Sequence, residues 1–259
     1  MAVSAAESMS ELREVSALFQ SVWGRTAEGV PFPSEAMRSL IHAGGLVSAA
    51  RRDGSLVGAA VLGRATGTTC YSYLAATLPG GADRGTGFAV KQHQRAWALS
   101  EGLTAMHWTF DPLVSRNARF NLSKLGACAR VYEPAFYGYM SDVLNGGDVA
   151  DRIVAEWVLP SVGAVSASEG TARPVGGPAE AVLEVAEPGP DGEAAWLRSS
   201  TEAWCRVPTD IVELRGTNPR QASAWRAAVA GWLAPAMADG YVATSAGPTG
   251  WYHLEKENR

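Results

Sequence analysis

The chain has 259 residues, of which 47% are hydrophobic and 19% are charged, and its formal net charge is -4. This length and composition predict a globular protein with a sizeable core and room for more than one domain, and the net negative charge argues against a general nucleic-acid binder. No apolar run approaches the roughly 18 residues that a membrane helix needs. Three scattered cysteines (Cys70, Cys128 and Cys205) and an N-terminus without a signal-peptide pattern predict a cytoplasmic protein with free thiols.

The N-terminal segment alternates helix and strand patterns. Apolar residues recur at helical spacing in Ser10–Val22, where Ser10 can cap the helix, and a second helix is predicted from Ser34. Leu46–Ala50 and Ser55–Leu62 have the pattern of two strands. They are joined at Asp53-Gly54, a dipeptide typical of tight turns.

A strand, a glycine-rich loop and a helix follow. Thr69–Leu78 has the Thr, Cys and Tyr content of a strand, and a helix is predicted from Thr86 to about Glu101. Between them, Arg84–Phe88 places glycines at a helix start, where free backbone N–H groups and the helix dipole favour a phosphate group. An ordinary glycine-rich turn is the alternative. The spacing fits neither a P-loop nor the full dinucleotide-binding fingerprint.

The remaining elements are predicted from periodicity and turn residues. Strands are predicted at Thr104–Phe110, Cys128–Tyr132, Arg152–Leu159, Ala181–Val185, Tyr241–Ser245 and Gly250–Glu255. Helices are predicted at Ser115–Leu125 before Gly126, at Ala194–Trp204, and from Asn218-Pro219, with Pro235 kinking or ending the last one. Between Pro160 and Glu193 the composition shifts to Gly, Pro, Ser and Ala. The predicted domains are therefore 1–162 and 163–259.

Several stretches carry a resemblance to one known superfamily. They are the loop at Gly85 and Gly87, Gln94-Arg95, Trp108–Leu113, Arg116–Ala127, Phe136–Gly138 and Glu156-Trp157. Together they resemble the GNAT superfamily of acyl-CoA N-acyltransferases, in particular the predicted acetyltransferases found beside N-acylamino-acid racemases. The resemblance implies an α/β GNAT fold, with a mixed, mostly antiparallel sheet, splayed strands four and five, and flanking helices. A C-terminal α/β extension is expected to pack on this fold.

The resemblance also implies a reaction and a set of binding residues. The protein would move an acetyl or succinyl group from acetyl-CoA or succinyl-CoA to the amino group of an amino acid or related small amine, without a metal. The residues expected to bind CoA are Ala76, Thr77, Arg84, Gly85, Thr86, Gly87, Phe88, Asn117 and Asn121. The two asparagines could instead cap a helix or face solvent. A homodimer is compatible with the sequence.

Three residues are candidates for the chemistry. Asp111 ends a predicted strand before Pro112, and we expect it to act as the base or to bind the acceptor ammonium, the alternative being a structural loop cap. Tyr73 stands where we expect histidine in the branch, although an ordinary tyrosine pKa near 10 makes it a poor base. His107 lies in a predicted strand and could equally be a core residue. The four histidines and three cysteines show no metal-ligand spacing.

The chain also departs from the superfamily pattern. Ala82 replaces the usual Arg or Gln of the loop, Asp83 brings a negative charge near the expected phosphates, and Leu122 stands where a tyrosine acid is usual. The strand expected to carry a glutamate base has none. These departures keep two alternatives open: a non-catalytic binding module with a degenerate CoA loop, or a specialised natural-product acyltransferase that uses another acyl carrier.

Overall fold

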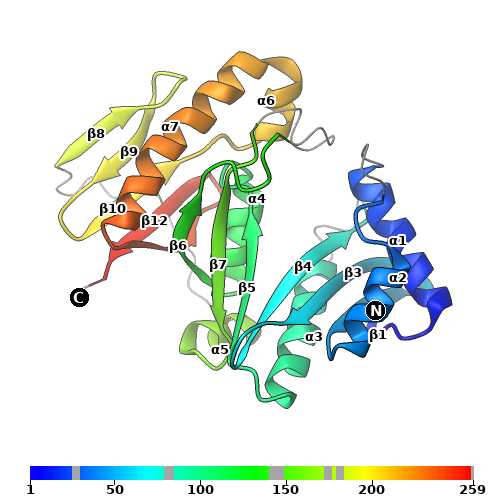
Figure 1. Ribbon diagram of the computed structural model, residues 1–259. Helices are drawn as coiled ribbons and strands as arrows, with labels where there is room; N and C mark the ends of the chain where they lie inside the picture. The colour runs from blue at the N-terminus through cyan, green and yellow to red at the C-terminus, as the bar shows by residue number, and fades with distance from the viewer. Residues whose placement is uncertain (25–29, 79–84, 140–148, 172–176, 179–183, 258–259) are drawn as a thin grey trace. The chain divides into compact units, whose positions relative to one another are not determined.

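The computed structural model describes residues 1–24, 30–78, 85–139, 149–171, 177–178 and 184–257 (Figure 1). The chain divides into two compact units, residues 1–108 and 109–259, and the division falls inside one strand. The predicted domain boundary at residue 162 stays a prediction. Within the described residues, no helix is both long and apolar enough to cross a membrane.

The first unit is a five-stranded sheet with three helices. Its elements are β1 (Ala2–Ala5), α1 (Met9–Trp23), α2 (Ser34–His42), β2 (Leu46–Arg52), β3 (Ser55–Arg64), β4 (Thr69–Thr77), α3 (Thr86–Ser100) and β5 (Ala105–Phe110). Strands β1 to β4 pair antiparallel in chain order, and β5 pairs parallel with β4. The strand β1 was not predicted, because a segment of four residues is too short to show a clear alternation of apolar and polar side chains. The parallel pair makes the sheet mixed, as predicted.

Helix α1 starts two residues earlier than the predicted cap. Its N-cap is Ser8, whose side chain accepts from the backbone N–H of Glu11, and Glu11 returns a bond to the Ser8 backbone. This capping box satisfies two N–H groups at the helix start, whereas a cap at Ser10 would satisfy one. The predicted cap at Ser10 is therefore wrong. The helix itself is confirmed.

The sheet of the first unit is covered on both faces by helices. The larger core joins residues of α1 and α2 to one face, where Val47, Ala49, Ala59 and Val61 point. The smaller core joins Val90 of α3 to Ala50 and Ala60. Neighbouring strand residues alternate between the two cores, as the period of two in a strand requires. Helix α3 therefore lies on the opposite face from α1 and α2.

Strands β4 and β5 are paired at one end only. The register joins Thr69 to Ala105, Cys70 to Met106 and Tyr71 to His107. Beyond these pairs, β4 continues to Thr77, and among the described residues it has no further partner on β5. On its other side β4 contains a bulge, because Ser72 pairs with Leu62 and Leu74 with Val61, which leaves Tyr73 as the extra residue. A bulge bends its strand, so it favours the separation of β4 from β5.

The second unit contains seven further strands in the order β7-β6-β11-β12-β10-β9-β8. These strands are β6 (Cys128–Glu133), β7 (Arg152–Val158), β8 (Val185–Pro188), β9 (Ala194–Arg198), β10 (Glu202–Arg206), β11 (Tyr241–Ala246) and β12 (Trp251–Lys256). The helices are α4 (Ser115–Ala118), a π-helical turn η2 (Arg119–Lys124), α5 (Val162–Ser168), α6 (Ile211–Thr217) and α7 (Pro219–Ala238). The helices α5 and α6 were not predicted.

The C-terminal extension continues the sheet of the second unit. Strand β11 pairs antiparallel with β6 at Ala243 and Ala129, and α7 contacts β6. Figure 1 shows α7 as the long orange helix of this unit. Its buried face carries Trp225, Val229, Trp232 and Ala236, as predicted. The extension thus shares backbone hydrogen bonds and core with the preceding residues.

One prediction in this unit is wrong, one is narrowed to a kink at Pro235, and one lies partly outside the described residues. The predicted helix at 194–204 is the hairpin β9–β10, in which Ala203 pairs with Arg198 and Cys205 with Trp196. Cross-strand pairing outweighs the helical propensity of the alanines there. Pro235 lies inside α7, which continues to Ala238 and does not end at the proline. Of the predicted strand 181–185, residues 181–183 lie outside the described residues, and Val185 begins β8.

Candidate functional site

The start of α3 offers uncapped backbone N–H groups. Its N-cap, Gly85, has a left-handed backbone with φ of 75°, and among the described residues no side-chain hydrogen bond caps the helix. The first turn contains no acidic residue. Thr86 is fully buried, and its Oγ1 has no hydrogen-bond partner among the described residues. This end of α3 has the dipole and the donors to hold an anion, as predicted for a phosphate site. The predicted Arg84 lies outside the described residues.

Gly58 on β3 lets the start of α3 lie close to the sheet. A Cβ atom at Gly58 would lie 2.7 Å from Thr86 Cγ2 and 3.2 Å from the carbonyl oxygen of Ala76. Any larger residue would therefore push α3 away from β3 and β4. Sequence reasoning missed this glycine, because its neighbours along the chain give no turn signal.

The free edge of β4 leads from this helix start to the point where β4 and β5 part. Ala76 is buried and Thr77 half-buried, and both lie on the part of β4 beyond the last pair with β5. Neighbouring residues of a strand turn their backbone groups to opposite edges, and the Leu78 N–H donates to Val57 on β3. The Ala76 backbone therefore faces β3, and the Thr77 backbone faces the free edge, where it is available for an amide of an extended ligand. The edge ends at Tyr71, whose register partner is the half-buried His107.

Tyr73, the bulge residue, is the most exposed of the predicted chemical residues. Its side chain is 45% exposed, and its ring lies 6.1 Å from that of Phe32 and 5.2 Å from that of Tyr71. A Cβ atom at Gly63 would lie 2.7 Å from the Tyr73 ring, so Gly63 makes room for it. Tyr73 is thus an exposed residue on β4 with a packed ring.

A buried lysine, Lys91 of α3, lies on the face of β4 opposite to Tyr73. Lys91 Nζ donates to Ser72 Oγ at 2.9 Å, and Ser72 Oγ donates to Gln94 Oε1 at 3.2 Å. The ammonium also lies 3.8 Å from the centre of the Trp108 ring. These four residues, Lys91, Ser72, Gln94 and Trp108, are here called the Lys91 cluster. Burial lowers the pKa of Lys91 to about 7.

Sequence reasoning missed the Lys91 cluster. The signal was present, because Lys91 and Gln94 fall among Val90 and Ala98 on the inward face of α3. Two polar residues on an apolar face indicate buried polar groups that need partners.

In the second unit, both oxygens of the predicted residue Asp111 are engaged. Oδ1 accepts from the Leu113 backbone N–H at 2.9 Å, and Oδ2 accepts from Arg215 of α6 at 2.8 Å. The Asp111 and Arg215 side chains are 12% and 9% exposed. The loop-capping role that the sequence allowed is therefore present, together with an ion pair that it did not indicate.

The two predicted asparagines differ in environment. Asn117 of α4 is exposed, whereas Asn121 of η2 is buried. Asn121 lies in a π-helical turn that follows directly on the α-helix containing Asn117. Their predicted binding role stays a prediction.

A second buried carboxylate stabilises the fold of this unit. Asp151 accepts from the Tyr132 hydroxyl and the Ala135 backbone N–H, each at 2.8 Å, and lies 3.6 Å from Arg226. Burial and the bond to Asp151 raise the pKa of Tyr132 well above its usual range. Tyr132 therefore stays protonated and serves as a fixed hydrogen-bond donor.

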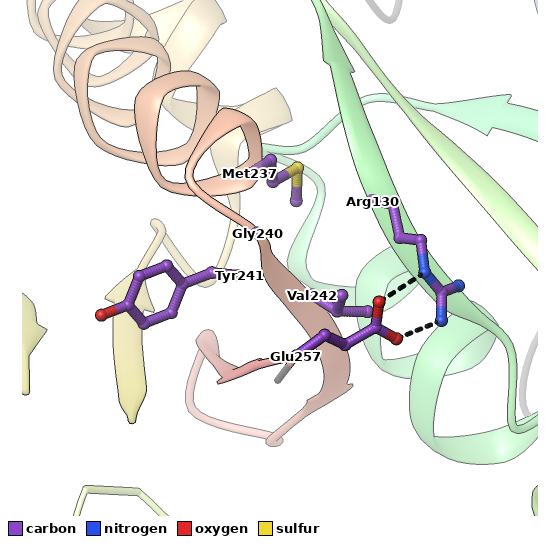
Figure 2. A pocket seen from close by; sticks show the side chains of 6 residues that line it. All are labelled: Arg130, Met237, Gly240, Tyr241, Val242 and Glu257. Atoms are coloured by element: carbon purple, nitrogen blue, oxygen red, sulfur yellow. Dashed lines mark hydrogen bonds and ion pairs between the residues drawn. The ribbon is translucent and has the colours of Figure 1, made fainter. Parts of the chain in front are cut away.

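A hollow of about 200 Å³ in the second unit lies beside Arg130 (Figure 2). Figure 2 shows the Arg130 guanidinium directed at the Glu257 carboxylate, with Nη2 2.6 Å from Oε1. Its Nη1 lies 2.5 Å from Glu156. The Arg130 guanidinium is thus engaged by two carboxylates. Among the described residues, no group of three or more His, Cys, Asp and Glu side chains could hold a metal ion.

Comparisons with known proteins agree with the geometry of the first unit. Residues 1–112 match the acetyltransferase (GNAT) domain family. No curated protein matches the sequence of this chain.

Solved structures share the fold at low sequence identity. The ribosomal-protein-S18-alanine N-acetyltransferase of Escherichia coli superposes with a TM-score of 0.51 at 13% identity, covering 62% of this chain and 95% of its own. An N-acetyltransferase from Staphylococcus aureus Mu50 also gives 0.51, at 14% identity, with 61% and 98% covered. A protein of Salmonella typhimurium, described as an acetyltransferase and solved with its cofactor acetyl-CoA, gives 0.50 at 16% identity, with 62% and 95% covered. The GNAT fold predicted from the sequence is confirmed, and the match to the acetyltransferase (GNAT) domain family covers residues 1–112.

Proposed function

We propose that this protein is a CoA-dependent N-acyltransferase. It would move an acetyl or succinyl group from acyl-CoA to the amino group of an amino acid or a related small amine. The observation that carries the proposal is that β4 leaves β5 after Tyr71, so that a free strand edge leads to the uncapped start of α3. The Trp108–Leu113 run favours the branch found beside N-acylamino-acid racemases. We place the end of the acyltransferase domain near residue 162 and expect a cytoplasmic protein.

Each part of the donor has a counterpart in the first unit. The pyrophosphate would accept hydrogen bonds from the backbone N–H groups of Gly85–Phe88, where the helix dipole favours negative charge. The amides of the pantetheine arm would pair with the backbone of β4 around Thr77, as an added strand does. These contacts use backbone groups, so they fit any acyl-CoA.

The reaction requires two proton movements. The amine nitrogen attacks the thioester carbonyl carbon, the C–S bond breaks, the amine loses a proton and the CoA thiolate takes one. Asp111 is our candidate for the group that receives the amine proton or holds the acceptor ammonium. Tyr73, an exposed residue on β4, is our candidate for the group that protonates the thiolate.

Isothermal titration calorimetry with acetyl-CoA, succinyl-CoA and free CoA tests the proposal. We expect all three to bind the parent and to raise its melting temperature, because a ligand that binds only the folded state stabilises it. Gly87→Val should weaken binding of all three, since a β-branched side chain would block the approach of a phosphate to the backbone. A variant that folds and binds CoA as well as the parent would contradict the assigned phosphate site.

A non-catalytic binding module is the second candidate. It is favoured by Asp111, whose carboxylate oxygens are both engaged by an arginine and a backbone N–H group. The same titrations, followed by a thiol-release assay with a panel of amines, separate the two functions. Binding of acyl-CoA without CoA release in the presence of any amine would favour the module.

A further inference from the structure

We propose that Lys91 and Gln94 form a subsite for a carboxylate, and hence that the preferred acyl donor carries a terminal carboxylate, as succinyl-CoA does. The inference rests on the proposed function, because it assigns the acyl end of the donor to the Lys91 cluster. It depends on three observations: the direction of the hydrogen bonds in the cluster, the absence of a carboxylate beside Lys91 among the described residues, and the position of the cluster along β4.

In the cluster, the oxygens of Ser72 and Gln94 both take part in hydrogen bonds, whereas the amide nitrogen of Gln94, a donor, forms none with the described residues. An ammonium can donate but not accept, so Ser72 Oγ must accept from Lys91 Nζ. The single proton of Ser72 then goes to Gln94 Oε1. This order fixes the orientation of the Gln94 amide and turns its Nε2 away from Ser72. Gln94 Nε2 has no hydrogen-bond partner among the described residues. The cluster therefore offers an ammonium and an amide N–H group to an acceptor.

The cluster holds a buried positive charge without a carboxylate. Lys91 is 3% exposed and Gln94 is fully buried. Across the part of the chain that the structure describes, no Asp or Glu oxygen lies within 4.0 Å of Lys91 Nζ. A buried charge is costly unless it is paired, and the Trp108 ring and one hydroxyl replace only part of its hydration. A bound carboxylate would supply the missing negative charge.

The position of the cluster suits the acyl end of the donor. Ser72 and Trp108 are the first residues after the last pair of β4 with β5, so the ammonium lies where the two strands begin to part. The free edge of β4 from Thr77 to Ser72 is about 17 Å long at ~3.3 Å per residue. A donor with its pyrophosphate at the start of α3 and its arm along this edge points its acyl group toward Ser72. An acetyl group has no negative charge to offer there, whereas a succinyl group does.

The test compares donors on the parent and on two variants. Lys91→Met keeps the length of the side chain and removes its charge, and Gln94→Glu places a carboxylate of the protein beside Lys91. By calorimetry, we expect succinyl-CoA to bind the parent more tightly than acetyl-CoA. Each variant should bind succinyl-CoA roughly ten- to a hundredfold more weakly, because charge-assisted hydrogen bonds are lost. Acetyl-CoA and free CoA should change by less than about threefold. The exposed Lys124→Met is the matched control and should change none of these affinities.

The outcomes separate this inference from the proposed function. If the parent binds acetyl-CoA at least as tightly as succinyl-CoA, the carboxylate subsite is wrong while the acyltransferase assignment stands. If the variants weaken all three ligands equally, the cluster is structural and the inference is again wrong. Should Lys91→Met fail to fold, Gln94→Glu alone decides, because it adds a salt-bridge partner to the buried ammonium. Failure of the parent to bind any CoA compound would overturn both.

Discussion

Replacing Lys91 by methionine measures what the buried ammonium costs the folded protein. The pKa of Lys91 is about 7, against a usual value of 10.5, because burial disfavours the charged form. At 1.36 kcal/mol per pKa unit, this difference corresponds to about 5 kcal/mol. Below pH 7 the amine is charged in both the folded and the unfolded protein, so the folded protein is destabilised by the full free energy of burying the charge.

The sign of the pH dependence follows from proton binding. Between pH 7 and about 10.5 the unfolded chain keeps the Lys91 proton while the folded protein has released it. The free energy of unfolding therefore rises with pH across this window, by up to about 5 kcal/mol. Cys70, which faces Lys91 from β4, has a pKa raised by burial to about 11, so it titrates above most of the window.

Urea unfolding of the parent and of Lys91→Met at pH 6, 7, 8 and 9 provides the measurement. The difference between the two proteins isolates Lys91, since the other titrating groups are common to both. At pH 6 we expect the variant to be more stable by about 2 kcal/mol or more, after allowing for the lost bond to Ser72 and the lost contact with Trp108. The advantage should shrink as the pH rises. A difference that stays constant from pH 6 to 9 would refute the reasoning.

Three further predictions concern single contacts. Asp111→Asn leaves the Arg215 charge buried without its partner, so we expect the free energy of unfolding in urea to fall by about 3 kcal/mol. If turnover per folded molecule stays at the parent level, Asp111 takes no part in the chemistry. Tyr73→Phe keeps the ring contacts and removes the hydroxyl, so turnover should fall at least about tenfold with an unchanged melting temperature; full turnover would contradict the assigned proton transfer. Gly58→Ala should push on Thr86, weaken CoA binding in calorimetry and lower the free energy of unfolding by about 1–3 kcal/mol. The control Gly231→Ala, whose added Cβ has no atom within 4 Å, should leave CoA binding unchanged.

The elements of the first unit were predictable because local signals and burial agree there. The turn at Asp53-Gly54 has positive φ at both residues, 51° and 80°, as the dipeptide predicts. The glycine start of α3 likewise has the left-handed conformation that its residue type allows. The β4 bulge was not predictable from the sequence. A single extra residue leaves the alternation of inward and outward side chains intact on either side of it, and only the pairing with β3 shows it.

The hairpin of β9 and β10 shows the limit of local pattern. Ala194–Trp204 contains residues that favour a helix, yet Trp196 and Trp204 are buried in a hairpin, and Trp204 pairs with His253 of β12, a strand distant in sequence. Similarly, the partner of Asp111 lies 104 residues away on α6, which no local spacing indicates. The structural role of Asp111 was foreseen as a loop cap, but the ion pair that decides the energetics of its substitution was not.

The two halves of the proposed donor site differ in what they can distinguish. The start of α3 and the edge of β4 use backbone groups, which bind the part that all acyl-CoA molecules share. Specificity is a difference between affinities, so contacts common to every donor do not contribute to it. Discrimination must then come from side chains near the acyl group. Among the described residues of the first unit, Lys91, Ser72 and Gln94 are polar side chains buried where β4 and β5 part, and their one atom without a hydrogen-bond partner is the donor Gln94 Nε2. Proteins that share this backbone fold can carry different side chains at the positions that contact the acyl group. A comparison of folds therefore cannot predict which acyl donor is preferred.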